Sequence, residues 1–344
     1  MTEAMRRLDT GGVGIVLVTD LGGELSGTLT DGDIRRAILG GRSLDVPVGE
    51  FLASKNNPVY PEPVCARIGW SRDRMLQVMQ ERRIRHLPVL DDDRRVVDLV
   101  LLEDLVDDPG EPLTAVVMAG GLGTRLRPLT TDTPKPMLPV GGRPLLERTI
   151  EHLRGAGVHD VVVSTRYKAE QVQAHFDDGR RFGVNVKYLT ENRPLGTAGS
   201  LRLMDRPDGT LLVINGDVLT NVDFRAMRAF HSEHGAMLTV GVRRYEFSVP
   251  YGVVDCDGVQ VAGLREKPTY TSFVNAGVYL LEPGVFDLLP DADGTPFNMT
   301  DLIGRLVEAG RAVVSFPIHE YWMDIGQRED YDKAQQDIAA GLAG

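Results

Sequence analysis

The sequence has few cysteines and no long apolar run, and each shortage excludes a class of protein. Only Cys65 and Cys256 occur in 344 residues, far apart and without metal-ligand spacing. Neither a disulfide framework nor a cysteine-based metal centre is therefore expected. No stretch approaches about 18 consecutive apolar residues, and Met1–Arg7 lacks the apolar centre of a secretory signal. We expect a cytoplasmic protein with no membrane partner.

The chain also lacks a basic stripe. Its formal net charge is -11, and its basic cluster at Arg82, Arg83 and Arg85 is short. Duplex-binding proteins usually gather Lys and Arg on one face, so no nucleic-acid partner is expected. An acidic protein that handles phosphates must instead supply positive charge locally or recruit a divalent cation.

What is present suits two soluble domains. Hydrophobic residues make up 42% and charged residues 25% of the chain, which is a globular balance, and 344 residues are comfortable for two domains. A run of two prolines, a glycine and three acids at 107–112 can continue neither a helix nor a strand. We therefore predict a linker at 109–113 between domains at 1–108 and 114–344.

The first region contains one pattern twice. Each copy reads as helix, apolar strand, turn, second strand and helix, and such a repeat suggests two half-units around a pseudo-twofold axis. The predicted elements are helix 2–9, strands 14–18 and 25–29 and helix 30–39, then helix 72–82, strands 86–90 and 96–101 and a helix from 103.

This repeat resembles a CBS domain pair, an α+β regulatory module, most sharply at Gly27–Ile34. The resemblance implies that an adenosine nucleotide binds between the halves, with Thr30 and Asp33 as its ligands. A capping box, in which Thr30 satisfies amides of the following helix, is an equal alternative. The second half departs from the family, because Leu101–Asp104 lacks the hydroxyl and Asp98 replaces a glycine. At most one good nucleotide site is therefore expected.

Beyond residue 114, strands and helices alternate. Continuous apolar runs at 115–119, 160–164 and 211–215 suit parallel strands that are buried on both faces, and 144–154 is an amphipathic helix. The alternation predicts an α/β fold with an open, mostly parallel sheet and helices on both faces. Ligands then belong at the carboxyl ends of the strands.

A glycine-rich segment, Gly120–Leu126, follows the first of these strands. It matches neither a Walker loop nor a dinucleotide fingerprint. Its three glycines still let backbone amides approach phosphate oxygens, and Arg125 adds a positive fork. Lys135 follows between two prolines that restrict its backbone. An ordinary surface loop remains the alternative, and the two cations at this spacing disfavour it.

The stretch Ala119–Val140 resembles the signature of the sugar-1-phosphate nucleotidyltransferases. The resemblance implies a Rossmann-like, GT-A-like fold. Further matches lie at Pro194–Gly199, Asn215–Asp217, Glu266–Pro268, Val274–Gly277 and Trp322–Gly326. By this resemblance, the nucleotide is contacted by Ala119, Gly120, Gly121, Gly123, Thr124, Gly196 and Thr197.

The chemistry of that family accounts for the charged positions. A sugar phosphate oxygen attacks the α-phosphorus of a nucleoside triphosphate, and pyrophosphate leaves. The nucleophile is already ionised, so the protein must mainly position anions and offset charge, as Arg125 and Lys135 would. The resemblance places Asp217 and Asp324 on one Mg²⁺, which suits a cation that prefers one or two carboxylates. A plain turn at Asp217 and a helix cap at Asp324 are the separate alternatives.

The sugar side follows from the resemblance alone. Glu266 and Asn275 would contact sugar hydroxyls, Lys267 the sugar phosphate, and Gly252 would line the pocket. An exposed turn is the alternative for residues 266–268.

Glu191 bears on the choice of base. Guanine shows two adjacent donors that one carboxylate can accept, whereas uracil and thymine flank one donor with carbonyl oxygens. This favours GTP, with UTP, dTTP or CTP as alternatives, although Glu191 could be a solvated loop residue. The whole chain looks most like guanylyltransferases of glucosamine, mannose or heptose 1-phosphate, with a homo-oligomer expected. A catalytically weak nucleotide-sensing protein is the alternative from another class.

Overall fold

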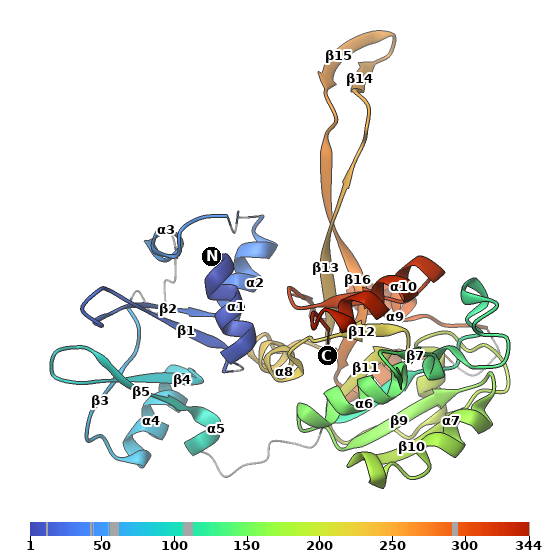
Figure 1. Ribbon diagram of the computed structural model, residues 1–344, viewed down its shortest axis with the longest axis horizontal. Helices are drawn as coiled ribbons and strands as arrows, with labels where there is room; N and C mark the ends of the chain where they lie inside the picture. The colour runs from blue at the N-terminus through green and yellow to red at the C-terminus, as the bar shows by residue number, and fades with distance from the viewer. Residues whose placement is uncertain are drawn as a thin grey trace. The chain divides into compact units, whose positions relative to one another are not determined.

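The computed structural model describes residues 1–11, 13–41, 43, 45–53, 55, 62–105, 113–290 and 295–343 (Figure 1). The chain divides into two compact units, Met1–Glu111 and Pro112–Gly344. Most of the predicted linker, 109–112, lies outside the described residues. Within the described ranges, no helix combines the length and apolarity that crossing a membrane requires.

The first unit contains the predicted repeat. In the first half, α1 precedes an antiparallel pair, β1 and β2, and two further helices follow. In the second half, β3, β4 and β5 form one sheet beside α4 and α5. Each half has its own apolar core. The bounds are α1 (Thr2–Gly11), β1 (Ile15–Thr19), β2 (Leu25–Thr30), α2 (Asp31–Leu39), α3 (Val48–Ala53), β3 (Ala66–Arg67), α4 (Arg72–Arg82), β4 (His86–Leu90), β5 (Val96–Leu101) and α5 (Leu102–Leu105).

The N-terminus of α2 is closed by a capping box. Thr30 Oγ1 accepts from the Asp33 amide at 3.3 Å, and Asp33 Oδ2 accepts from the Thr30 amide at 2.9 Å. Lys55 pairs with the same carboxylate at 2.7 Å, and Arg36 with its other oxygen at 2.9 Å. Burial would raise the pKa of Asp33, but the bonds from Lys55 and Thr30 outweigh burial and lower it. The capping alternative is therefore confirmed, while the ligand role of Thr30 and Asp33 stays a prediction.

A seven-stranded sheet forms the centre of the second unit. Its order is β10-β9-β6-β11-β16-β13-β17, and β16 alone runs antiparallel to its neighbours. The predicted open, mostly parallel sheet is thus confirmed. The strands are β6 (Thr114–Met118), β9 (Asp160–Thr165), β10 (Asn185–Thr190), β11 (Leu211–Asn215), β13 (Leu238–Ser248), β16 (Thr269–Leu281) and β17 (Val313–Pro317).

Both faces of this sheet are buried, which explains the continuous apolar runs. Along β6, Ala115 and Val117 belong to one core and Val116 to the other, because successive side chains point to opposite faces. Residues of α6, α7 and α8 cover the first face, and α9 covers the second. The helices are α6 (Leu145–Gly155), α7 (Ala169–Phe176), α8 (Phe224–Glu233), α9 (Met299–Glu308) and α10 (Arg328–Ala339).

Short strands and single turns complete the unit. A third apolar cluster joins α10 to the turns that follow the glycine loop, through residues that include Leu126, Leu138, Ile325 and Tyr331. The short strands form three pairs, β7 (Pro139–Val140) with β8 (Arg143–Pro144), β12 (Val218–Thr220) with β18 (Trp322–Asp324), and β14 (Val253–Asp257) with β15 (Gln260–Arg265).

Thr30→Ala should lower the free energy of unfolding of the first unit by about 1 kcal/mol, because the Asp33 amide loses its acceptor. Urea unfolding followed by Trp70 fluorescence would measure this in a Trp322→Phe background, since the chain has two tryptophans. Thr30→Ser keeps the hydroxyl and should retain most of the stability. An alanine variant as stable as its parent would show that this cap contributes nothing.

Candidate active site

Two carboxylates more than a hundred residues apart in the sequence meet through one strand pair. β12 and β18 run antiparallel with Val218 opposite Asp324, and the Ile325 amide donates to the Asp217 carbonyl at 2.9 Å. Although Asp324 is exposed as a residue, neighbouring protein atoms partly desolvate its carboxylate. This desolvation raises the pKa of Asp324, Asp217 raises it further, and Lys135 and Arg125 oppose the rise. The two acids therefore act on one another electrostatically.

Lys135 supplies the local positive charge. It lies in a single turn, Lys135–Met137, is almost fully buried, and its Nζ is 2.7 Å from Asp217 Oδ2. The extended backbone of Pro134 and the ring of Pro136 at the second position fix how that turn begins. The chain thus directs a buried ammonium at one of the two carboxylates.

The glycine loop is shaped by close packing at two positions and left open at a third. A Cβ on Gly120 would lie 2.8 Å from Glu191 Oε1, and one on Gly123, where φ is +61°, would lie 2.9 Å from Thr130. Gly121 has open space where its side chain would be. The backbone at Gly121 is therefore open to a larger group, whereas protein packing requires glycine at 120 and 123; the phosphate contact of the loop stays a prediction.

Arg125 lies in the same neighbourhood. A Cβ on Gly326 would be 3.6 Å from its Nη1, and its charge acts on the Asp324 carboxyl. Arg125, Lys135, Asp217 and Asp324 therefore converge beyond the carboxyl ends of β6 and β11, where an open α/β sheet binds ligands. The donor set suits a divalent cation, because a cation between the two carboxylates would remove the repulsion that raises the pKa of Asp324.

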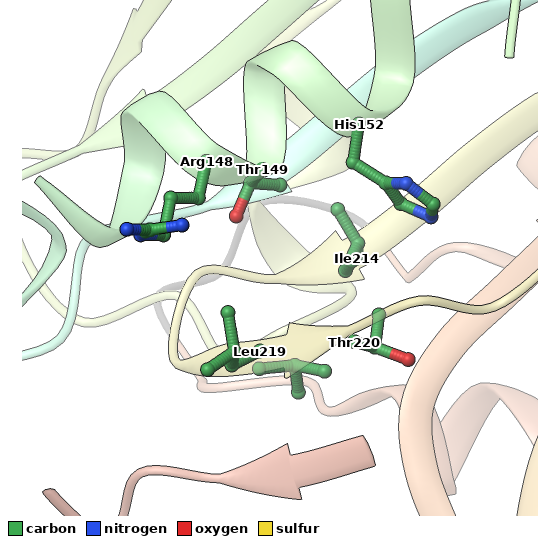
Figure 2. Close-up of a pocket in the computed structure, with 7 residues that line it drawn as sticks. Arg148, Thr149, His152, Ile214, Leu219 and Thr220 are labelled. Atoms are coloured by element: carbon green, nitrogen blue, oxygen red, sulfur yellow. The ribbon is translucent and has the colours of Figure 1, made fainter. Parts of the chain in front are cut away.

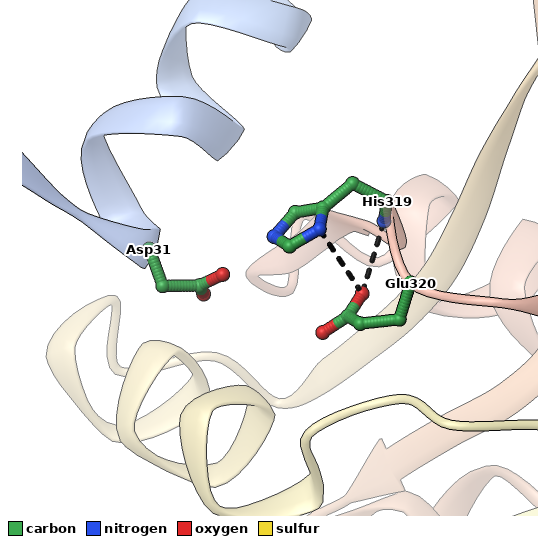
Figure 3. A group of neighbouring side chains, drawn as sticks. All are labelled: Asp31, His319 and Glu320. Atoms are coloured by element: carbon green, nitrogen blue, oxygen red, sulfur yellow. Dashed lines mark hydrogen bonds and ion pairs between the residues drawn. The ribbon is translucent and has the colours of Figure 1, made fainter. Parts of the chain in front are cut away.

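The turn before β18 is fixed by Glu320. Its Oε2 accepts from the His319 amide at 3.0 Å, and the two side chains lie side by side (Figure 3). Its Oε1 accepts from the amide of Asp223 at 3.2 Å, and Arg243 donates to the backbone carbonyls of Ile318 and Glu320. This network sets the course of the chain that delivers Asp324. No pattern in the sequence indicates this network.

Glu191 is held in place rather than solvated. It follows β10, Ser164 Oγ donates to its Oε1 at 2.6 Å, and the Leu195 amide donates to its Oε2 at 3.2 Å. The alternative of a freely solvated loop residue is therefore wrong. Each oxygen retains acceptor capacity, so a ligand with two donors can still bind. Ser164 was not among the predicted site residues, because its only signal is a hydroxyl near the end of an apolar strand.

The loop 195–199 is pinned to the start of α9. Gly196 has φ +82°, and a Cβ there would lie 2.5 Å from the Phe297 carbonyl oxygen. The amides of Ala198 and Gly199 donate to that same oxygen, and Thr197 Oγ1 accepts from the Met299 amide at 2.9 Å. The hydroxyl of Thr197 thus has a structural partner, and its nucleotide contact stays a prediction.

Asn275 is oriented by Tyr279, which was not among the predicted site residues. Asn275 Oδ1 accepts from the Gly277 amide at 3.0 Å and from the Tyr279 hydroxyl at 2.9 Å. Burial raises the pKa of Tyr279 to about 12, so the phenol stays neutral and donates. Asp217 contributes to this rise, so the pair lies within electrostatic reach of the carboxylates. The NH₂ group of Asn275 makes neither bond and is the donor suited to a sugar hydroxyl.

The remaining predicted sugar residues lie elsewhere. Gly252 and Glu266 are neighbours, since a Cβ on Gly252 would be 3.1 Å from Glu266 Oε2, and Lys267 follows with φ +44°. They flank β14 and β15, at the far end of the long ribbon of β13 and β16 (Figure 1). Thr269 lies six positions before Asn275 on the extended strand β16, a span of about 20 Å. One chain therefore does not gather the four predicted sugar residues into one pocket.

A small cavity lies between α6 and the β11–β12 segment (Figure 2). It has room for about one water molecule. Burial lowers the pKa of His152 in its wall, so this imidazole stays neutral. The predicted catalytic residues are not among its lining, which consists of Arg148, Thr149, His152, Ile214, Val218, Leu219 and Thr220.

Comparison with known proteins gives a family match in each unit. A nucleotidyl transferase family model matches residues 114–341, and a CBS domain model matches residues 59–109, the second half of the repeat. The mannose-1-phosphate guanylyltransferase of Mycobacterium tuberculosis is 34% identical over 234 residues, or 67% of this chain and 65% of that protein. The mannose-1-phosphate guanyltransferase of Schizosaccharomyces pombe is 34% identical over 230 residues, or 64% of this chain and 62% of that protein. The matches thus span just under two thirds of these relatives.

Solved structures share the fold. HddC from Yersinia pseudotuberculosis, complexed with GMP-PN, superposes with a TM-score of 0.50 and 28% identity over 65% of this chain and 99% of its own. A putative glucose-1-phosphate thymidylyltransferase from Bacillus anthracis gives 0.53 and 24% identity over 65% of this chain and 94% of its own, a likeness in fold. The chain therefore belongs to the nucleotidyl transferase family and carries a CBS domain in its N-terminal unit.

Proposed function

We propose that the protein transfers a nucleotidyl group from a nucleoside triphosphate to a hexose or hexosamine 1-phosphate, forming an NDP-sugar and pyrophosphate. The observation that carries the proposal is the convergence of Arg125, Lys135, Asp217 and Asp324 beside the glycine loop. A protein that had lost catalysis and only sensed nucleotides would have no use for this arrangement. The guanylyltransferases among its relatives support the same reaction class.

The reaction needs positioning and charge compensation more than acid–base chemistry. The phosphate of the sugar attacks as an ionised oxygen, so no side chain has to remove a proton. Lys135 and Arg125 would hold the triphosphate and offset charge that develops on the transferring group. Asp217 and Asp324 would hold Mg²⁺, which when bound would neutralise phosphate charge. The open backbone at Gly121 gives the phosphates close access to amides.

GTP is the nucleotide that Glu191 favours. Its carboxylate is fixed by Ser164 and Leu195 and keeps acceptor capacity for the two adjacent donors of guanine. The two relatives are guanylyltransferases of mannose 1-phosphate. This supports GTP over UTP, dTTP or CTP as the nucleotide, and mannose 1-phosphate over glucosamine or heptose 1-phosphate as the acceptor.

Residues 1–108 would form a regulatory CBS pair in this proposal. An adenosine nucleotide at Thr30 and Asp33 would have to displace Lys55 or share the carboxylate with it. Any effect on catalysis requires the nucleotide to bind two states of the protein unequally. The working form would be a cytoplasmic homo-oligomer.

Asp217→Asn and Asp324→Asn should each lower kcat about 100-fold or more, because each removes a charge that would hold the metal. The rate of pyrophosphate release with GTP, Mg²⁺ and mannose 1-phosphate measures this. Asp332→Asn is the matched control, since Asp332 pairs with Arg328 on the exposed surface of α10 and should leave the rate unchanged. An Asp217→Asn protein with the wild-type rate would remove the metal assignment.

A matrix of four nucleotides and three sugar phosphates should give the fastest pyrophosphate release with GTP. Glu191→Gln should lower kcat/KM for GTP about 10-fold to 100-fold, as expected for the loss of charge-assisted hydrogen bonds. The rate with UTP should change far less, and Glu170→Gln on α7 serves as the control. If UTP or dTTP exceeds GTP tenfold in the wild-type protein, the role given to Glu191 is wrong.

A further inference from the structure

Arg166 is a cation at the glycine loop that the proposed function does not use. It follows β9 directly, and its Nε donates to the Gly120 carbonyl at 3.3 Å. A Cβ on Gly120 would lie 3.6 Å from Arg166 Cβ, so the side chain begins against the first residue of the loop. A guanidinium has five N–H donors, and this bond uses one of them. Within the described part of the chain, Arg166 has no second hydrogen bond and no carboxylate partner.

The strand register puts Arg166 beside Glu191. In the parallel pair of β9 and β10, Thr165 lies opposite Thr190, and each of these threonines is followed at once by one of the two charged residues. The Glu191 amide donates to the Thr165 carbonyl at 2.9 Å, which joins the two strand ends. The same Cβ on Gly120 that would meet Arg166 would lie 2.8 Å from Glu191 Oε1. Arg166 and Glu191 therefore flank one point of the loop backbone.

The two side chains are neighbours that do not pair with each other. The oxygens of Glu191 accept from the Ser164 hydroxyl and the Leu195 amide, and Arg166 donates to the Gly120 carbonyl instead of to the carboxylate. A cation and an anion that are free to move would form a charge-assisted bond. Here separate bonds to the protein hold them apart. The site therefore presents free acceptor capacity and free donors side by side.

The position of Arg166 along the loop favours contact with a base over contact with phosphates. Lys135, the buried ammonium, borders the other end of the loop, because a Cβ on Gly123 would lie 3.1 Å from Lys135 Cβ. Arg166 and Glu191 border Gly120, where the loop begins. The base is the part of a nucleoside triphosphate that lies farthest from its β- and γ-phosphates. Phosphates held near Lys135 would therefore leave the base at the end that Arg166 borders.

Guanine is the base that suits both side chains. Its N1–H and 2-amino donors match the carboxylate of Glu191, and the next two polar atoms along its edge, O6 and N7, are both acceptors. The planar fork of an arginine binds these two acceptors together, which is the commonest specific contact to guanine in DNA. Adenine and cytosine carry an amino group in place of O6, and uracil and thymine have no acceptor that corresponds to N7.

We propose that Arg166 is a specificity-determining residue that donates to O6 and N7 of guanine while Glu191 accepts from N1–H and the 2-amino group. The inference rests on the proposed function, because it names the residue that selects the nucleotide of that reaction. It also assigns to Arg166 the exclusion of adenine, whose amino group would face the donors of the guanidinium. A brace for the Gly120 carbonyl is the competing role, and its effect would not depend on the base.

Calorimetry on the full-length chain, with Mg²⁺ and without a sugar phosphate, measures the affinity for GTP and for 7-deaza-GTP. The analogue replaces N7 with carbon and keeps every group that Glu191 would contact. The wild-type protein should bind it about tenfold more weakly than GTP, as expected for the loss of one hydrogen bond to a charged donor. Arg166→Met keeps a long apolar stem without donors, so it should bind GTP at least tenfold more weakly and no longer distinguish the two nucleotides.

Two controls isolate the contact. ITP lacks only the 2-amino group, so the preference for GTP over ITP should persist in Arg166→Met. Arg180→Met removes an exposed arginine that pairs with Asp178, and it should leave every affinity unchanged. If Arg166→Met loses affinity for GTP, 7-deaza-GTP and UTP by the same factor, Arg166 is a brace and the assignment is wrong. Equal affinities of the wild-type protein for GTP and 7-deaza-GTP would also overturn it, and that comparison needs no variant to fold.

The inference and the proposed function fail in different ways. A wild-type protein that prefers GTP to 7-deaza-GTP but releases no pyrophosphate with any sugar phosphate would refute the reaction and leave the guanine contact in place. Pyrophosphate release from GTP, together with equal affinities for GTP and 7-deaza-GTP, would refute the role of Arg166 and leave the reaction in place.

Discussion

The antiparallel pairing of β12 with β18 holds the carboxylates of Asp217 and Asp324 together, and other parts of the second unit stabilise that pairing. Desolvation raises the pKa of Asp324, and repulsion from Asp217 raises it further. The pairing persists because backbone bonds secure it, including those from Ile325 to Asp217 and from Asn221 to Tyr321. The buried ammonium of Lys135 compensates one of the charges. Such an arrangement is costly without a bound cation, and that cost is typical of a binding site rather than of a structural ion pair.

The layered sheet explains why the site can tolerate this repulsion. Strands buried on both faces form a rigid platform with two apolar cores, and the functional residues lie in loops and short strands beyond its carboxyl edge. Most of the stabilisation therefore lies away from the charged groups. The third cluster, built around α10, anchors the C-terminal segment that carries Asp324, so a distant part of the chain is held at the glycine loop.

The N-terminal unit shows how one motif can satisfy two interpretations. Thr30 and Asp33 close the start of α2, and Lys55 and Arg36 neutralise the carboxylate. These bonds account for the residue types without any ligand. They also preorganise a hydroxyl and a carboxylate at one helix start, so a nucleotide would meet groups that are already in place. Glu191 is similar, because each of its oxygens accepts one hydrogen bond from the protein and keeps acceptor capacity for a base.

Local patterns in the sequence determined the elements of the fold and the family of the glycine loop. Apolar runs of period two or 3.6 give strands and helices, because side-chain periodicity is a property of neighbouring residues. Charged residues beside Gly120–Leu126 pointed to a triphosphate, because they too are close to the loop in the sequence. Only the tertiary structure decided that Val218 pairs with Asp324, that Ser164 fixes Glu191, and that Tyr279 orients Asn275. It also placed Glu266 and Lys267 at the far end of the β13–β16 ribbon, away from Asn275. Contacts of this kind depend on strand register and on packing between distant segments of the chain. Neither produces a periodic pattern of residues in the sequence.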